Sequence, residues 1–210
     1  MCKMEFVLAL LALCVGLAHS WDYAVSGGSD QISLFTNQKM TGVITIETRK
    51  IATLAYDEVH NMMLYVDKQT SGDIICGYDF ASADNKCFTE EKGRNIHGLA
   101  YDPVTDLVFF TDTNERSVNW ISLTAGTNNI VKGKFLIYDG TPRSIVVDSC
   151  KGYIYWLNTN LANPKIERAR LNSTEREVYQ NVNLVRVNAN FNFEPHSLAI
   201  DQQSQAIYWM

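Results

Sequence analysis

Two sets of polar residues recur along this chain at nearly constant intervals, and both consist of residue types that can do chemistry. The acidic set has steps of 45, 46 and 53 residues, and its members are Asp57, Asp102, Asp148 and Asp201. The second set has steps of 46 and 53 residues, and its members are His97, Arg143 and His196. Arginine can bind a carboxylate through two parallel hydrogen bonds, and histidine gains charge near endosomal pH. The second set therefore predicts a docking site for an acidic or hydrogen-bonding loop of a protein ligand, unless each residue only caps its own strand.

The acidic set has a different explanation. Carboxylates act as general acids and bases, or bind calcium, only where several of them converge on one point. Residues that recur once per repeat are spread over the molecule instead. Each of these aspartates ends an apolar run at a turn, where a carboxylate can accept hydrogen bonds from nearby backbone N–H groups. We therefore expect turn-capping aspartates rather than catalytic residues or a metal site.

Catalytic signatures are missing from the rest of the sequence. It contains no G-x-S-x-G, no H-E-x-x-H, no phosphate-binding glycine loop and no C-x-x-C pair. His60 lies in a polar turn, where a lone histidine is expected to be solvated. The sequence predicts a protein that is not an enzyme and that needs neither a metal nor another cofactor.

The recurring residues belong to a repeated β-rich unit. The segments "LAYDEVHNMMLYVD", "LAYDPVTDLVFFTD", "IVVDSCKGYIYWLN" and "LAIDQQSQAIYWM" align, and each holds two short β-rich runs around a polar turn. Two more strand-like runs follow in each of the first three units, for example 73–78 and 87–90. Four strands in about 45 residues are typical of a β-propeller blade. The units lie near 54–98, 99–144, 145–197 and 198–210, and residues 21–47 supply three further strand-like runs.

The first 20 residues have the features of a signal peptide. Lys3 precedes an apolar run from Phe6 to Leu17, and Ala18-His19-Ser20 forms a small-x-small cleavage site. The run is shorter than the roughly 20 residues that span a bilayer. A buried N-terminal helix is the alternative, but it leaves the cleavage site unexplained. We expect a mature chain of residues 21–210 in the secretory pathway.

The charge pattern argues against a nucleic-acid partner. The formal net charge is −5, and the chain has no basic run or stripe of the kind that binds phosphate backbones. After the signal peptide, no second apolar segment of membrane length occurs, so this chain contains no predicted membrane span.

The cysteines and one asparagine fit an oxidising compartment. Cys76 and Cys87 flank a polar turn, where two antiparallel strands can bring them together, so we favour a disulfide between them. Two buried free thiols are the alternative, and the pairing of Cys150 stays open. Asn172 begins the sequon Asn-Ser-Thr in a polar turn and is a predicted glycosylation site.

The repeat carries a recognisable motif at the end of its hairpin. The segments 109–112 (FFTD), 155–158 (YWLN) and 208–210 (YWM) resemble the class B "YWTD" repeats of low-density-lipoprotein receptors. That family builds six-bladed propellers, and the resemblance covers residues 21–210. The motif is degenerate here, because 64–67 (LYVD) lacks the aromatic pair and Asn158 replaces the last aspartate. We expect the motif aromatics to fill the layers between stacked blades; an aromatic ligand cage is the alternative.

The mature start, "WDYAVSGGSDQISLF", follows the signal peptide directly and resembles an insect type I membrane receptor of this family. The resemblance implies an extracellular propeller that binds a protein ligand, with a role in germ-cell development (oogenesis and spermatogenesis). It also implies growth-factor-like (EGF-like) modules, one membrane span and a cytoplasmic tail after the propeller. Receptors related to it shed their ligands on acidification.

An enzyme of another class is the alternative function. A secreted six-bladed hydrolase of the calcium-dependent lactonase type would hold calcium in the central channel through carboxylates and amides. The residues aligned at the channel mouth are Ala52, His97, Arg143 and His196, and no carboxylate is among them. A mouth with cationic side chains is a poor calcium site, so the sequence favours the receptor.

Length limits the number of blades. Residues 21–210 suffice for about four units, so we expect an open, incomplete propeller in which the strands from the two ends do not share a sheet. Residues 181–193 lengthen the third unit. They are predicted to form an elongated outer hairpin or a loop reaching the channel face, or else a surface loop without a role.

Overall fold

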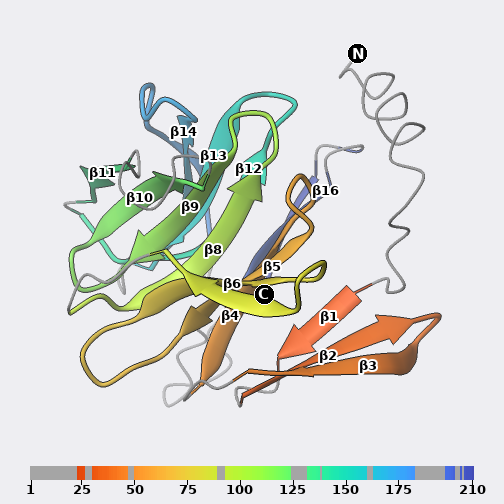
Figure 1. Ribbon diagram of the computed structural model, residues 1–210. Coiled ribbons are helices and arrows are strands. Elements are labelled where there is room, and N and C mark those ends of the chain that lie inside the picture. The colour runs from red at the N-terminus through yellow and green to blue at the C-terminus, as the bar shows by residue number, and fades with distance from the viewer. Residues whose placement is uncertain are drawn as a thin grey trace, which may run out of the picture.

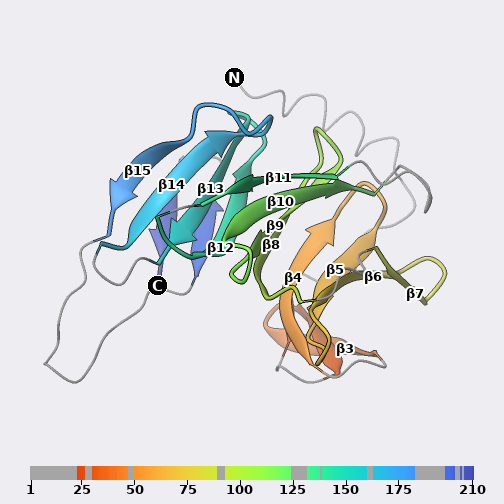
Figure 2. The same ribbon diagram turned by 90° about the vertical axis from the view of Figure 1, so that its left-hand side faces the viewer.

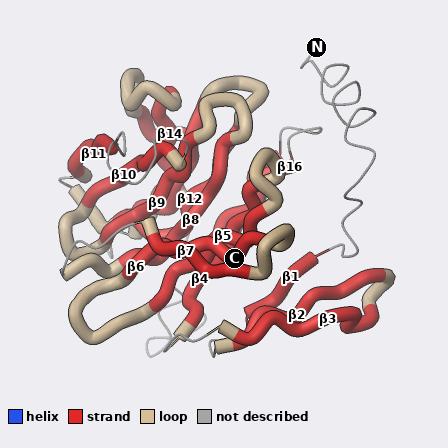
Figure 3. The backbone as a smooth tube through the Cα atoms, viewed as in Figure 1, coloured by secondary structure: helices blue, strands red, loops and turns tan. Residues whose placement is uncertain are grey.

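The computed structural model describes residues 23–26, 30–46, 50–88, 93–123, 132–137, 139–159, 163–182, 197–201, 204 and 206–210. Within these ranges the regular elements are β-strands in five antiparallel sheets (Figure 3). No described helix has the length and apolar character needed to cross a bilayer. The predicted signal peptide, residues 1–20, lies outside the described ranges.

Three of the sheets have four strands each, in the order of the sequence, and we call them the first, second and third blades. The first blade consists of β4 (Ile51–Asp57), β5 (Met62–Asp67), β6 (Ile74–Asp79) and β7 (Asp84–Cys87). The second consists of β8 (Ile96–Asp102), β9 (Leu107–Asp112), β10 (Ser117–Ser122) and β11 (Lys132–Leu136). The third consists of β12 (Pro142–Asp148), β13 (Tyr153–Asn158), β14 (Lys165–Arg170) and β15 (Glu177–Asn181). The predicted four-stranded units are confirmed.

The two ends of the described chain form smaller sheets. One contains β1 (Tyr23–Ser26), β2 (Gln31–Thr36) and β3 (Lys39–Thr45), and the other contains β16 (Leu198–Asp201) and β17 (Ala206–Trp209). These two sheets are separate, so strands from the two ends do not share a sheet, as expected. The sheets follow one another face to face, and β8 contacts both β4 and β12 (Figures 1 and 2).

A layer of apolar side chains fills each space between neighbouring sheets. Phe110 packs with Leu64 of the first blade, whereas the adjacent Phe109 packs with Trp156 of the third. Tyr155 points the other way from Trp156, toward Leu198 of β16. Because successive side chains of a strand point to opposite faces, the pairs Phe109–Phe110 and Tyr155–Trp156 each bury one ring on either side of their blade. Tyr208 and Trp209 of the last copy are exposed. The predicted role of these four buried rings as layers between blades is confirmed.

The innermost strands of neighbouring blades approach one another closely. A Cβ atom on Gly98 of β8 would lie 2.5 Å from the carbonyl oxygen of Arg143 and 2.8 Å from the amide nitrogen of Ile145, both in β12. Only glycine fits there, because the obstructing atoms belong to the backbone. Between β12 and β16, the amide of Leu198 donates to Oγ of Ser144 at 2.9 Å. These contacts fix the relative positions of three inner strands.

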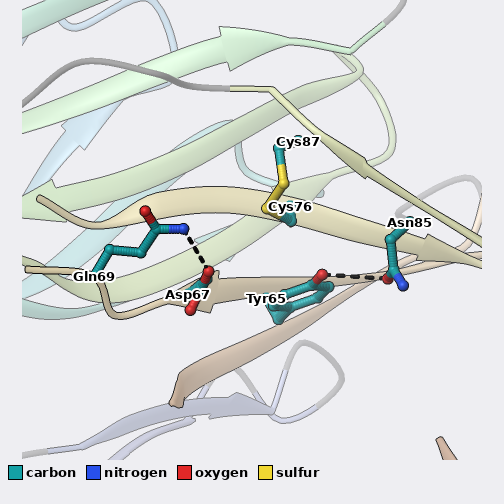
Figure 4. The surroundings of a disulfide bond; sticks show 6 residues. All are labelled: Tyr65, Asp67, Gln69, Cys76, Asn85 and Cys87. Carbon is teal, nitrogen blue, oxygen red and sulfur yellow. Dashed lines mark hydrogen bonds between the residues drawn. A yellow bond between two sulfur atoms is a disulfide. The ribbon is translucent and has the colours of Figure 1, made fainter. Parts of the chain in front are cut away.

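The fourth strand of the first blade begins earlier than the sequence predicts. It spans Asp84–Cys87 rather than 87–90, because a tight turn closes with a 2.9 Å hydrogen bond from the amide of Ala83 to the carbonyl oxygen of Asp79. Its residues are polar and exposed, so no apolar alternation marks it. A disulfide joins Cys87 to Cys76, which lies directly opposite on β6 (Figure 4). Beside it, the Tyr65 hydroxyl donates to Oδ1 of Asn85 at 3.2 Å.

A buried carboxylate explains why the third blade ends its motif with Asn158. Glu167 on β14 lies opposite Trp156, and its Oε2 accepts hydrogen bonds from Trp156 Nε1 at 3.2 Å and Asn158 Nδ2 at 2.8 Å. Arg176 donates to both carboxylate oxygens, at 2.9 and 3.1 Å. An aspartate at 158 would place a second carboxylate against Glu167, whereas the amide supplies a donor.

Candidate functional site

The four repeated aspartates cap the turns at the ends of their strands. Asp57 Oδ1 accepts hydrogen bonds from the amides of Val59 at 3.0 Å and His60 at 2.9 Å. In the other units the donors are the amides three residues further on, at 3.0 Å for Asp102, 3.0 Å for Asp148 and 3.3 Å for Asp201. The predicted turn-capping role is confirmed.

The inner strands of the three blades carry candidate residues at both ends. In β8, His97 lies next to the first residue and Asp102 is the last residue, about 17 Å away at 3.4 Å per residue. We call the end with Ala52, His97 and Arg143 the mouth end and the end with the capping aspartates the turn end. Any binding at one end is therefore spatially separate from binding at the other.

The mouth-end residues lie at β-bulges. The pairing of the inner strand is irregular near its start in all three blades: between Ile51 and Leu54, between Ile96 and Gly98, and between Pro142 and Ile145. A bulge leaves a residue out of the ladder and redirects its side chain. Ala52 and His97 are exposed and Arg143 is half-buried, while His196 lies outside the described residues.

Neighbouring threonines position Arg143. Its Nε donates to Oγ1 of Thr159 at 3.2 Å, and that hydroxyl lies 3.2 Å from the carbonyl oxygen of Thr141, to which it donates. The backbone carbonyl of Arg143 accepts a hydrogen bond from Oγ1 of Thr111 on the second blade. The guanidinium group is thus held at the start of β12, beside the strand that carries His97. Thr141 and Thr159 were not predicted, since hydroxyl residues outside the strands carry no distinctive spacing; Thr111 belongs to the motif 109–112, but its contact with Arg143 was not predicted.

At the turn end, His60 differs from the expectation of a solvated histidine. Its Nδ1 lies 2.7 Å from Oδ2 of Asp57 and 3.7 Å from Oδ1 of Asp106 in the second blade, and its side chain is 34% exposed. The position of His60 in the turn explains its contact with Asp57. Thr105 and Ser204 stand three residues after their own capping aspartates, as His60 does, and each donates its hydroxyl to that aspartate.

Asp106 takes the position in the second turn that Asn61 takes in the first. It has a left-handed backbone conformation with φ 55°, as does Asn61 in the first turn with φ 52°. The Tyr101 hydroxyl donates to Oδ1 of Asp106 at 2.9 Å, as the Tyr56 hydroxyl does to Oδ1 of Asn61 at 2.8 Å. Burial, the hydrogen bond to Asp106 and the charge of Asp57 raise the pKa of Tyr101 well above its ordinary value. The hydroxyl therefore remains a donor at all physiological pH values.

Comparisons with known proteins agree with this geometry. No family model matches the sequence. A chain in the crystal structure of a nidogen/laminin complex superposes with a TM-score of 0.73 at 21% identity, covering 89% of this chain and 68% of that one. The protein therefore has the fold of a YWTD-type β-propeller.

The sequence itself is similar to one group of insect proteins. Protein cueball of Drosophila yakuba is 25% identical over 97% of this chain, and that of Drosophila virilis is 27% identical over 96%. The chain is thus a distant homologue of cueball over nearly its whole length. It spans 32% of the length of these relatives.

Proposed function

We propose that this chain is the extracellular ligand-binding propeller of a single-pass type I cell-surface receptor with a role in oogenesis and spermatogenesis. The observation that carries the proposal is the similarity to cueball over 97% of the chain. The proposed receptor also has growth-factor-like modules, a membrane span and a cytoplasmic tail beyond the propeller. In this role the domain binds a partner and does not catalyse a reaction.

Two features of the chain support an extracellular location. The disulfide between Cys76 and Cys87 suits an oxidising compartment. The sequon at Asn172 lies in an exposed turn, in which Asn172 Oδ1 accepts hydrogen bonds from the amide and the hydroxyl of Thr174 at 3.2 and 2.6 Å. Such a turn is accessible to glycosylation.

The mouth end is the proposed ligand-binding face. His97 and Arg143 lie at matching positions of adjacent inner strands, and we place His196 with them on the register of the sequence repeat. Arg143 would pair with a carboxylate of a protein ligand, and the histidines would add positive charge at endosomal pH. The propeller of similar fold comes from a complex of nidogen with laminin, which supports a protein as the partner.

Surface labelling of the full-length protein tests the proposed location. We expect a membrane-impermeant biotin reagent to label it on intact insect cells, and enzymatic removal of N-glycans to increase its gel mobility. An Asn172→Gln variant should migrate faster than the wild type before that treatment, whereas Asn114→Gln, which changes an exposed asparagine outside any sequon, should not. Release of the whole protein into the medium, without a membrane-bound pool, would contradict a receptor.

A further inference from the structure

We propose that Asp57, His60 and Asp106 form a binding site for a divalent transition-metal ion of the zinc class. The ion would join the hairpin turns of the first and second blades at the turn end, away from the proposed ligand-binding face. The capping aspartates are spread over successive blades, and so they do not converge on one another. Asp57 instead meets Asp106, which occupies a different position of the neighbouring unit.

The three ligand atoms are already close to one another. One ligand atom from each of Asp57, His60 and Asp106 lies within 4.8 Å of the other two. His60 Nδ1 lies 2.7 Å from Oδ2 of Asp57 and 3.7 Å from Oδ1 of Asp106. In a tetrahedral zinc site, bonds of about 2.0 Å place neighbouring ligand atoms about 3.3 Å apart. The observed separations lie on both sides of that value. Small side-chain movements therefore suffice to surround an ion.

The charge balance calls for a cation. In the described part of the chain, His60 is the one basic side chain within ion-pair distance of either carboxylate. In addition, Oδ2 of Asp106 is buried and has no hydrogen-bond partner. A buried carboxylate oxygen without a partner is costly, because it has lost its hydration. A bound ion would neutralise both carboxylates and compensate this loss.

The surrounding hydrogen bonds leave the ligand atoms correctly oriented. Oδ1 of Asp57 holds the two turn amides, so Oδ2 can bind a metal ion without opening the turn. The Tyr101 hydroxyl donates to Oδ1 of Asp106, the oxygen that faces His60, and so fixes the direction of that carboxylate. Metal ligands in proteins commonly have such outer partners, which fix their direction.

The donor types select the class of metal. One imidazole nitrogen and two carboxylate oxygens suit zinc and similar ions, whereas calcium takes six to eight oxygen ligands. The side chain of His60 is 34% exposed, which leaves a path for the ion and room for water as a further ligand. The site would be structural, because it lies between two turns.

Residues at equivalent positions of neighbouring repeats suggest two substitutions that remove a metal ligand but preserve the conformation of the turn. His60→Thr copies Thr105, which holds the equivalent place and donates to its own capping aspartate. Asp106→Asn copies Asn61, which has the same left-handed conformation and accepts the same tyrosine hydrogen bond. Asp84→Asn, on the exposed strand β7, is the control with matched chemistry. Circular dichroism without metal would verify that each variant is folded.

Zinc chloride titrated into chelator-treated full-length protein tests the site by calorimetry. We expect the wild type and Asp84→Asn to bind one zinc ion. His60→Thr and Asp106→Asn should bind it at least about 100-fold more weakly, because loss of a residue that only hydrogen-bonds to a metal ligand already lowers affinity by about 10–100-fold. Zinc at about 100 times the wild-type dissociation constant should raise the Tm of the wild-type domain by roughly 5–10 °C and that of either variant by no more than about 2 °C. Absence of zinc binding by the wild type, or equal binding by all four proteins, would overturn the proposal. If one variant does not fold, the other decides.

Discussion

Replacing Glu167 by alanine is expected to lower the free energy of unfolding by about 3–5 kcal/mol. The substitution leaves two buried donors, Trp156 Nε1 and Asn158 Nδ2, without their acceptor. It also removes the carboxylate that Arg176 contacts through both oxygens. Each unsatisfied buried group costs about 1–3 kcal/mol, which accounts for the expected magnitude. Urea-induced unfolding, followed by tryptophan fluorescence, measures the change.

Glu177→Ala is the matched control for this prediction. Glu177 also contacts an arginine, Arg168, but its side chain is 53% exposed, so its removal should cost less than about 1 kcal/mol. Similar losses for Glu167→Ala and Glu177→Ala would show that the buried network does not stabilise the third blade.

Phe109→Ala and Phe110→Ala should each destabilise the protein by about 3–5 kcal/mol, although the two residues are adjacent in sequence. Phe109 is fully buried against the third blade and Phe110 against the first. In a sheet with one solvated face, one of the two substitutions would be tolerated, because alternate residues point to water. Stacked blades bury both faces, so neither ring is dispensable.

Thermal and urea unfolding of the two variants, beside Val104→Ala, tests this stacking. Val104 is 72% exposed at a turn, so its truncation should change the stability by less than about 0.5 kcal/mol. A loss below about 1 kcal/mol for either phenylalanine would contradict the packing of blades on both faces.

The sequence repeat predicts most of this fold, because the residues that determine each blade lie within a single repeat unit. Each unit brings its own hairpin, its own capping aspartate and its own pair of bulky residues, and alternation along one strand is enough to assign both faces. The same reasoning could have assigned His60. It stands three residues after Asp57, where the second and fourth units carry the hydroxyl donors Thr105 and Ser204, but a histidine in a polar turn did not by itself indicate that partner.

Contacts between residues that occupy different positions in their repeat units could not be predicted from the sequence. His60 meets Asp106 because the turns of two blades lie side by side, and a comparison of equivalent positions does not reveal such a pair. Asn158 departs from the motif because its amide donates to Glu167, which lies opposite Trp156, and the sequence alone does not show that contact. Residues 183–196, which include His196 and most of the predicted loop 181–193, lie outside the described residues, so those two predictions stay predictions.

Binding of the extracellular region to living ovary and testis cells tests the central claim most directly. The region, fused to an antibody Fc fragment, would be quantified on cells by flow cytometry as wild type, Arg143→Ala and Arg170→Ala. We expect Arg143→Ala to weaken binding by about tenfold or more, as for the loss of an interface residue that contributes roughly 1.4 kcal/mol. Arg170→Ala, which changes a partly exposed arginine on the third strand, β14, where it pairs with Glu175, should bind as the wild type does. Equal binding by the wild type and Arg143→Ala would contradict a ligand-binding face at the mouth end.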